Sequence, residues 1–293
     1  LNVSRAKDPV FTSTLIRRMN RFEYATAGQD LLKLKVSVFP LPEKMMRDRS
    51  GYFNKAIKGG MPDSLTVSSR PLGKSGLIEP RLSGVGPFPQ DLRAEHGYDN
   101  QADHLSLSPL LMEAFFQLSR TIVTSSTFGP KTVGIWKDFF QAPPKEEDLK
   151  KVLAARLKPF LTQAFRRSVK KETLKRYLSH ALGSLKKGAT FEATMKDVVS
   201  AVLASPRFLY LYDSLESEQD AFSEEVFLAS RLSFFLWGSL PDEELLELAR
   251  TGRLSNPEIL DGQLDRILSD PKLKRFCDSF PTQWLQLDRI ISA

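Results

Sequence analysis

The densest group of side chains that could do chemistry lies in the segment EHGYDNQADHLSLSP. Its carboxylates and imidazoles fall within ten residues, and they are Glu95, His96, Asp99, Asp103 and His104. Groups of these types could hold a cation, and Asp or His could transfer protons. The spacing matches neither an EF-hand loop nor a zinc pattern. Asp99, Asp103 and His104 are therefore candidate catalytic residues and Glu95, His96, Asp99 and Asp103 candidate metal ligands, beside the alternative of a hydrogen-bonded turn before a helix.

The chain lacks the short motifs of common catalytic and cofactor sites. It contains no Walker loop and no GxSxG, HExxH, CxxC, CxxCH or GxGxxG sequence. Gly84 and Gly86 are followed by Pro87, which cannot continue a dinucleotide-binding turn. Without CxxCH, no haem can be attached covalently to this chain. The sequence thus predicts no cofactor here, and it leaves open whether the protein is an enzyme.

Arginine and tryptophan stand out in the apolar C-terminal segments. Arg231 interrupts the otherwise apolar run LASRLSFFLW, and a buried guanidinium requires a partner, so an ion pair with a neighbouring helix is expected. We expect Phe234, Phe235, Trp237 and Trp284 to fill the core. Arg231, Trp237 and Trp284 are accordingly predicted to be structural residues.

Positive charge is concentrated in one part of the chain. The net charge of the 293 residues is +7, but residues 131–187 hold 15 Lys or Arg against 5 Asp or Glu. Such a segment could bind an acidic polysaccharide or nucleic acid. Nucleic acid is the less favoured partner because aromatic residues do not alternate with the basic ones. The alternative is a solvated helix surface.

Several further classes are excluded by composition. The longest apolar stretch, residues 226–237, is too short to span a membrane. The single cysteine, Cys277, rules out an internal disulfide, and its surroundings predict a helix. Both ends read as internal to a longer protein, so a targeting signal would lie outside this chain.

The elements that must position these residues are predicted to be helices. The pattern predicts a helix over residues 13–33 with Ser13 as its cap, and a second helix after Ser108 and Pro109 with Leu110, Ala114, Leu118 and Ile122 on one face. Residues 40–90 contain 14 Gly or Pro among 51 and are expected to form a long loop region. Residues 124–144 are expected to be a connector that ends at a domain boundary.

The second half of the chain is predicted to be wholly helical. Asn256 before Pro257 and Asp270 before Pro271 are cap signals, and Gly188 and Gly252 stand where left-handed helix ends are expected. The helices are expected at residues 145–167 (kinked or broken at Pro159), 171–186, 190–204, 222–237, 241–251, 257–269 and 271–287. The predicted class is mainly α, with two helical domains and a Gly/Pro-rich loop region in the N-terminal part. The first expected unit is residues 1–130, with an insertion at about residues 40–94. The second unit is residues 145–215. The third is residues 220–293, and it is expected to pack on the second.

Three groups of motifs resemble one multidomain family of unknown function from planctomycete and verrucomicrobial bacteria. They are IRRMNRFEYATAGQDLL with HGYDNQADHLSLSPLLME, then FLTQAFRRSVKKETLKRYL with VVSAVLASPRFLYLYD, and finally VFLASRLSFFLWGSLPDEELLELA with FPTQWLQL. The resemblance covers residues 13–33 and 95–291, and it implies three consecutive domains, the third of them truncated. No catalytic residue is assigned in the family, so none is carried over.

The resemblance implies an exported protein of the periplasm or cell envelope, associated with planctomycete-type cytochrome c domains. Haem c would then lie elsewhere in the full-length protein. We expect an accessory helical module that docks a cytochrome c domain or another envelope protein. Two alternatives stay open: a basic surface for acidic polysaccharide or nucleic acid, and a part of an oxidoreductase or hydrolase whose catalytic domain lies outside this chain.

Overall fold

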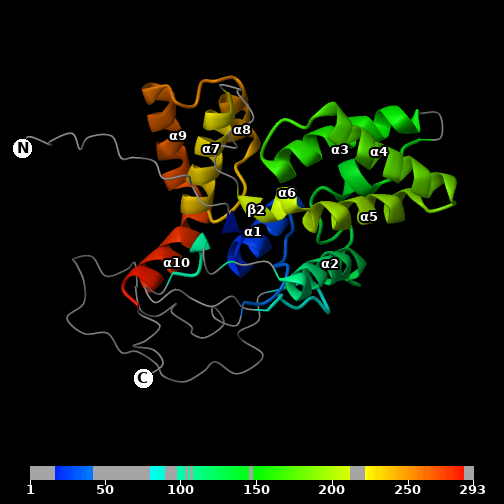
Figure 1. Ribbon diagram of the computed structural model, residues 1–293, viewed down its shortest axis with the longest axis horizontal. Coiled ribbons are helices and arrows are strands. Elements are labelled where there is room, and N and C mark those ends of the chain that lie inside the picture. The colour runs from blue at the N-terminus through cyan, green and yellow to red at the C-terminus, as the bar shows by residue number, and fades with distance from the viewer. Residues whose placement is uncertain are drawn as a thin grey trace, which may run out of the picture.

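The computed structural model describes residues 17–41, 80–89, 98–102, 105, 108–144, 148–211 and 222–286. The described part of the chain is mainly α-helical, as predicted (Figure 1). Its elements, in chain order, are β1 (Arg17–Arg18), α1 (Arg21–Leu31), α2 (Pro109–Thr124), η3 (Trp136–Phe140), α3 (Leu149–Phe165), α4 (Lys171–Lys186), α5 (Phe191–Leu203), α6 (Pro206–Leu209), β2 (Tyr210–Leu211), α7 (Phe222–Leu236), α8 (Glu243–Arg250), α9 (Pro257–Ser269), η4 (Pro271–Leu273) and α10 (Lys274–Trp284). Most of the Gly/Pro-rich region, residues 42–79, lies outside the described residues.

Helix α1 lies between two groups of helices, with α2 to α6 on one side and α7 to α10 on the other (Figure 1). The two-residue strand β1 leads into it and pairs antiparallel with β2, with Arg17 opposite Leu211. The amide of Met19 also donates to the carbonyl of Leu209 at 2.8 Å. These bonds fix the start of α1 against the end of the α3–α6 group.

The predicted helix ends are largely confirmed. Ser108 accepts a hydrogen bond from Leu111 N at the start of α2. Asn256 and Asp270 cap α9 and η4 through their side chains. Gly188 and Gly252 have φ values of 90° and 66°, in the left-handed region expected after α4 and α8.

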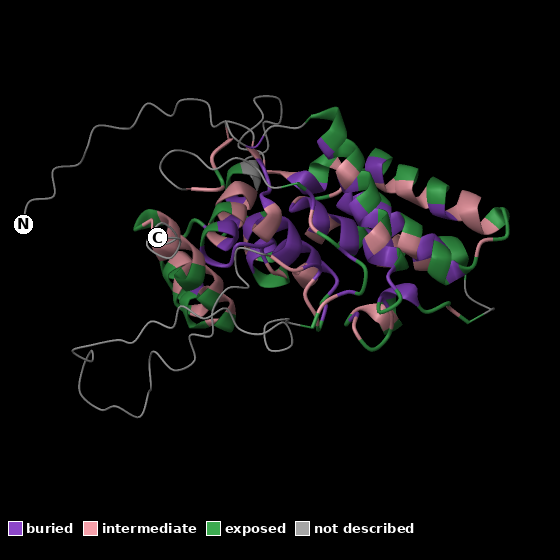
Figure 2. Cartoon of the chain, turned by 90° about the horizontal axis from the view of Figure 1, so that it is seen from below, coloured by how far each residue is buried: buried purple, intermediate pink, exposed green. Residues whose placement is uncertain are grey.

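One hydrophobic core joins the first two expected domains. Helices α2 and α5 pack closely, and between them the hydroxyls of Ser119 and Ser200 lie 3.0 Å apart. The core runs from Met19 to Leu240 and includes Phe128 and Phe140. Those two residues belong to the expected connector, so residues 124–144 are packed into the core rather than forming a free linker. The buried residues lie between the helices (Figure 2).

A second, smaller cluster lies among α7, α8 and α9. Trp237 is fully buried in it, as predicted, and its indole nitrogen donates to the carbonyl of Ile267 at 3.3 Å. Glu225, also buried, accepts hydrogen bonds from the amides of Leu254 and Ser255 and from the Ser255 hydroxyl. A buried carboxylate bonded in this way holds the loop after α8 against α7.

Three local predictions require correction. The first helix begins at Arg21 with Asn20 as its cap, because residues 17–18 form strand β1. The predicted cap, Ser13, lies outside the described residues. Of the two alternatives at Pro159, a kink or a break, the break is wrong, because α3 continues through Pro159 to Phe165. Leu110 is 72% exposed, and the buried stripe of α2 runs through Leu111, Phe115, Leu118 and Ile122.

None of the described helices is both long and apolar enough to cross a membrane.

Candidate functional site

A hollow of about 160 Å³ lies where α1, α7, α10 and the segment 98–100 meet. Its walls are largely aromatic and its remaining lining is polar. The aromatic lining comprises Phe22, Tyr98, Phe234, Phe235, Phe276 and Phe280, and the polar lining comprises Asn20, Glu23, Asp99, Asn100, Arg275, Ser279 and Gln283. Aromatic walls with a few converging polar groups are typical of ligand and partner sites.

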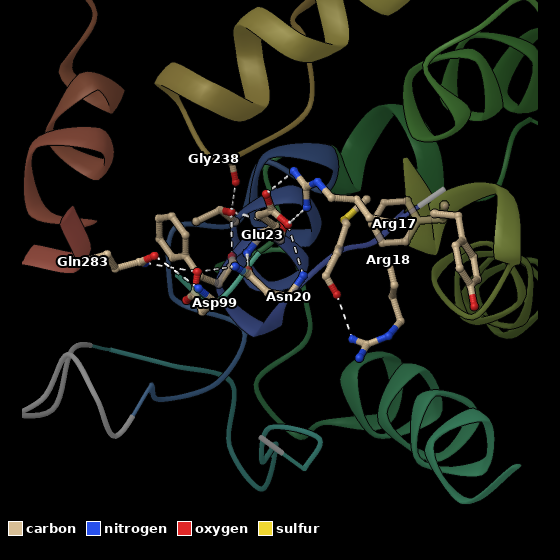
Figure 3. Close-up of polar contacts among 12 residues, drawn as sticks. Arg17, Arg18, Asn20, Glu23, Asp99, Gly238 and Gln283 are labelled. Carbon is tan, nitrogen blue, oxygen red and sulfur yellow. Dashed lines mark hydrogen bonds and ion pairs between the residues drawn. The ribbon is translucent and has the colours of Figure 1, made fainter. Parts of the chain in front are cut away.

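The start of α1 forms one polar edge of this hollow (Figure 3). The side chain of Asn20 accepts from the amide of Glu23 at 2.8 Å, and the Glu23 carboxylate accepts from the amide of Asn20 at 3.1 Å. Arg17 adds a bidentate ion pair to Glu23, at 2.7 and 2.8 Å. The Glu23 carboxylate is therefore engaged in fixing the helix start.

Asp99 bridges α1 and α10 (Figure 3). Its Oδ1 accepts from Asn20 Nδ2 at 3.0 Å and from Gln283 Nε2 at 3.1 Å, while its amide donates to Gln283 Oε1 at 3.3 Å. Each bond joins segments far apart in the sequence. This arrangement supports the structural alternative for Asp99: the carboxylate ties two helices together through neutral amide groups.

The other candidates from the same segment lie outside the described residues. These are Glu95, His96, Asp103 and His104. Within the described ranges, no three His, Cys, Asp or Glu side chains are grouped as ligands for a metal ion. The candidate catalytic roles of Asp103 and His104, and the candidate metal-ligand roles of Glu95, His96 and Asp103, stay predictions.

A second polar junction holds α10 against α1. Arg275 donates to Asp30 through both terminal nitrogens, at 2.9 and 3.1 Å, and Lys272 Nζ lies 3.1 Å from the same carboxylate. Burial by itself raises the pKa of Asp30, but hydrogen bonding and charge from Arg275, with the charge of Lys272, outweigh it and leave the pKa below its ordinary value. Arg275 also donates to the carbonyl of Trp237 at 3.3 Å.

Among the residues that the structure describes, two arginines are buried that were not predicted to be, and the arginine that was expected to be buried is exposed. Arg231 is exposed on α7, which corrects its expected burial. Arg18 is fully buried, with its guanidinium over the rings of Phe88 and Phe115 at 5.6 and 5.5 Å. The sequence signal, a basic residue beside an apolar helix start, was too general to single out Arg18.

Arg166 is the second buried arginine, and it ends α3 in the left-handed conformation, with φ 56°. It donates to the carbonyls of Phe208 at 3.1 Å, Arg207 at 3.1 Å and Tyr210 at 2.7 Å. Its guanidinium also lies 5.7 Å from the ring centre of Phe234 on α7. Arg166 thus links the α3–α6 group to the wall of the hollow, a role that only the folded chain reveals.

Two of the four aromatic residues expected in the core lie at the surface instead. Phe234 is buried as expected, but Phe235 is 59% exposed and Trp284 is 62% exposed. On α10, Phe276 stacks on Phe280 with ring centres 5.0 Å apart, and Phe280 stacks on Trp284 at 6.0 Å. Phe235 joins this row at 5.1 Å from Phe276. We call these four residues the α10 ridge; it begins beside the hollow and continues into solvent.

Cys277 is exposed on the same helix.

The comparisons with known proteins give three family matches in chain order. Residues 77–127 match PSD3, described as a protein of unknown function (DUF1587). Residues 152–213 match PSD5, a protein of unknown function (DUF1595), and residues 224–293 match PSD4, a protein of unknown function (DUF1592). No curated protein and no solved structure matched the chain.

The class defined by fold and matches is therefore a mainly α-helical chain with three consecutive domains of unknown function. The hollow lies at a junction between them. Asp99 comes from the first matched region, and Phe235, Arg275 and Gln283 come from the third.

Proposed function

We propose that this chain is a non-catalytic interaction module of an exported, cytochrome c-associated protein of the bacterial cell envelope. The three matched domains, in this order, are typical of planctomycete proteins associated with cytochrome c. The module would dock a cytochrome c domain or another envelope protein. Haem would be carried by that partner, because this chain has no CxxCH sequence.

The observation that carries this proposal is the α10 ridge. Trp284 and Phe235 are more than half exposed, and Leu285, next in the chain, is 54% exposed. Phe276 and Phe280 are half-buried between them. Large aromatic residues are enriched at the centres of protein interfaces and contribute much of the binding energy there. A continuous row of four rings at the surface is therefore suited to a protein partner.

The polar groups around the hollow favour docking over catalysis. The Glu23 carboxylate forms an ion pair with Arg17, and the Asp30 carboxylate forms ion pairs with Arg275 and Lys272. The Asp99 carboxylate accepts hydrogen bonds from two amide side chains. Such pairs hold side chains in place, whereas catalysis requires a group that can reach substrate. The rigid support beneath the ridge means that little side-chain freedom would be lost when a partner binds.

A binding measurement with the cytochrome c domain encoded in the same protein or operon tests this proposal. Trp284→Ala should weaken the complex at least about tenfold, as expected for a central aromatic anchor. Phe116→Ala is the matched control, because Phe116 is 52% exposed but lies on α2. Both variants should retain the melting temperature of the unchanged chain.

Two outcomes would contradict the proposal. One is the absence of any complex between the unchanged chain and the cytochrome c domain at micromolar concentrations. The other is a complex that Trp284→Ala and Phe116→Ala weaken to the same extent. In the second case the partner would contact the module away from α10.

A further inference from the structure

Helix α4 carries an unusual excess of positive charge on its solvent side. Over residues 171–187 the chain has five Lys or Arg and a single acidic residue, Glu172. All five basic residues are exposed, and they are Lys171, Lys175, Arg176, Lys186 and Lys187. We call them the α4 basic face.

The one-sided arrangement follows from how α4 packs. Its buried residues are Thr173 and Ala181, and helices α3 and α5 contact it from that side. With 3.6 residues per turn, Lys171, Lys175 and Lys186 fall within about 60° of one another on the opposite side. Arg176 and Lys187 lie about 110° and 130° from the middle of this row, both on the same side of it, and both are exposed. The cations therefore form two groups on the solvent side of the helix, with Lys171, Lys175 and Arg176 near its start and Lys186 and Lys187 at its end.

Two lysines on other helices, one half-buried and one exposed, each pair with a carboxylate of the same helix. Lys196 on α5 pairs with Glu192 at 2.8 Å, and Lys274 on α10 pairs with Asp278 at 2.8 Å, both at i,i+4 spacing. Among the residues the structure describes, no ion pair involves Lys171, Lys175 or Lys186. A solvated surface helix usually mixes both signs of charge to form such pairs. Helix α4 instead keeps its positive charge available.

We propose that the α4 basic face binds a linear acidic polysaccharide. A row from Lys171 to Lys186 extends about 22 Å at 1.5 Å per residue, which suits a chain with carboxylate or sulfate groups at regular intervals. This binding is separate from the docking proposed for the α10 ridge, and either could be disproved without the other.

Three features favour a polysaccharide over nucleic acid. Tyr177, the aromatic residue of α4 nearest these cations, is half-buried and packs against the core, so it does not offer a free ring on which a base could stack. The helix is held against α3 and α5 along its length, so it does not project as a recognition helix that enters a DNA groove. Four of the five cations are lysines, whose ammonium groups act as point charges, whereas arginine dominates in bidentate recognition of bases and phosphates.

The test compares two triple variants with equal loss of charge. Lys171→Gln, Lys175→Gln and Lys186→Gln together remove the row on α4. The control combines Lys35→Gln, Lys137→Gln and Arg253→Gln, three exposed residues outside α4. Each lowers the net charge from +7 to +4. The unchanged chain and both variants are measured on immobilised heparin, polygalacturonate, neutral dextran and a duplex DNA, over a range of salt concentrations.

We expect binding to heparin or polygalacturonate that weakens steeply with salt, and none to dextran. The α4 variant should bind at least about tenfold more weakly at low salt, with a shallower salt dependence because fewer counterions are released. The control variant should bind within about twofold of the unchanged chain. Circular dichroism establishes that both variants are folded.

The proposal is overturned if neither acidic glycan binds at low ionic strength, or if both triple variants lose affinity equally. Tighter binding to duplex DNA than to either glycan, lost in the α4 variant alone, would assign the face to nucleic acid instead. Trp284→Ala should leave glycan affinity unchanged, which separates this result from that of the docking experiment.

Discussion

Asp30 and Arg275 form a bidentate ion pair across 245 positions of sequence, with oxygen–nitrogen distances of 2.9 and 3.1 Å. Both side chains are mostly buried, at 16% and 20% exposed. The pair joins the end of α1 to the first turn of α10. It thereby attaches the helix that carries the α10 ridge to the middle of the molecule.

The substitution Asp30→Asn should lower the free energy of unfolding by about 2–4 kcal/mol at pH 7, because it leaves two cations beside a neutral amide. The pKa of Asp30 is lowered on folding, so its ion pair stabilises the fold above the ordinary carboxyl pKa, and this is lost as pH falls through the folded value. The stability difference between the unchanged chain and the variant should therefore shrink below about pH 4. Denaturant unfolding at several pH values measures it, and Asp265→Asn, exposed on α9, is the control.

Asp99→Ala should destabilise the chain by about 1–3 kcal/mol, because it leaves Asn20 Nδ2 and Gln283 Nε2 without their shared acceptor. The neighbouring Asn100 is exposed, and Asn100→Ala should change stability by less than about 0.5 kcal/mol. Thermal unfolding of the two variants gives the comparison. Equal melting temperatures for Asp99→Ala and the unchanged chain would remove the structural role that we assign to Asp99.

Gly238→Ala should be strongly destabilising. Gly238 has φ 57°, and a Cβ there would lie 2.6 Å from Cε1 of Phe22. Its carbonyl accepts from the Thr26 hydroxyl at 2.5 Å, so the loop cannot move away without breaking that bond. We expect a loss of about 2–4 kcal/mol from left-handed strain and overpacking.

Gly262→Ala provides the opposite expectation within the same chain. Gly262 lies inside α9, and apart from its chain neighbours and the backbone of its own helix no atom lies within 4 Å of its Cβ position. Alanine there should stabilise by about 0.5–1 kcal/mol through helix propensity. The denaturation midpoints of the two glycine variants should therefore shift in opposite directions. Shifts in the same direction would contradict the different surroundings that we assign to the two glycines.

Arg166→Lys should cost about 2–4 kcal/mol although the charge is kept. A lysine cannot reach the carbonyls of Arg207, Phe208 and Tyr210 at once with the planar fork that arginine provides. Arg176→Lys, on the exposed side of α4, should be nearly neutral. Urea unfolding followed by tryptophan fluorescence compares them, and a near-neutral Arg166→Lys would contradict this account.

The sequence predicts best where the cause of structure is local. Caps at Ser108, Asn256 and Asp270 depend on a side chain and the amides of the next turn, so they could be identified from a few residues. The buried stripe of α2 could not be fixed in this way. Leu110 and Leu111 both begin a row with helical spacing, and the packing against α5 selects the row that starts at Leu111.

The candidate site was predicted only in part, because its contacts are long-range. Asp99 was singled out by its residue type, but its partners Asn20 and Gln283 lie 79 and 184 positions away. The same reason explains the first helix: residues 17–18 pair with β2, which no local pattern indicates. Phe235 and Trp284 of the α10 ridge were expected in the core because an apolar helix face looks the same whether it covers the core or meets solvent.

The separation between Asp30 and Arg275 also has a consequence for biosynthesis. At roughly 5–20 residues per second, a ribosome makes Arg275 on the order of 10–50 s after Asp30. During that time α1 lacks the helix that neutralises its carboxylate, and Thr26 lacks the carbonyl of Gly238. Helix α1 is thus made before the other described helices, yet it is among the last of them to complete its contacts.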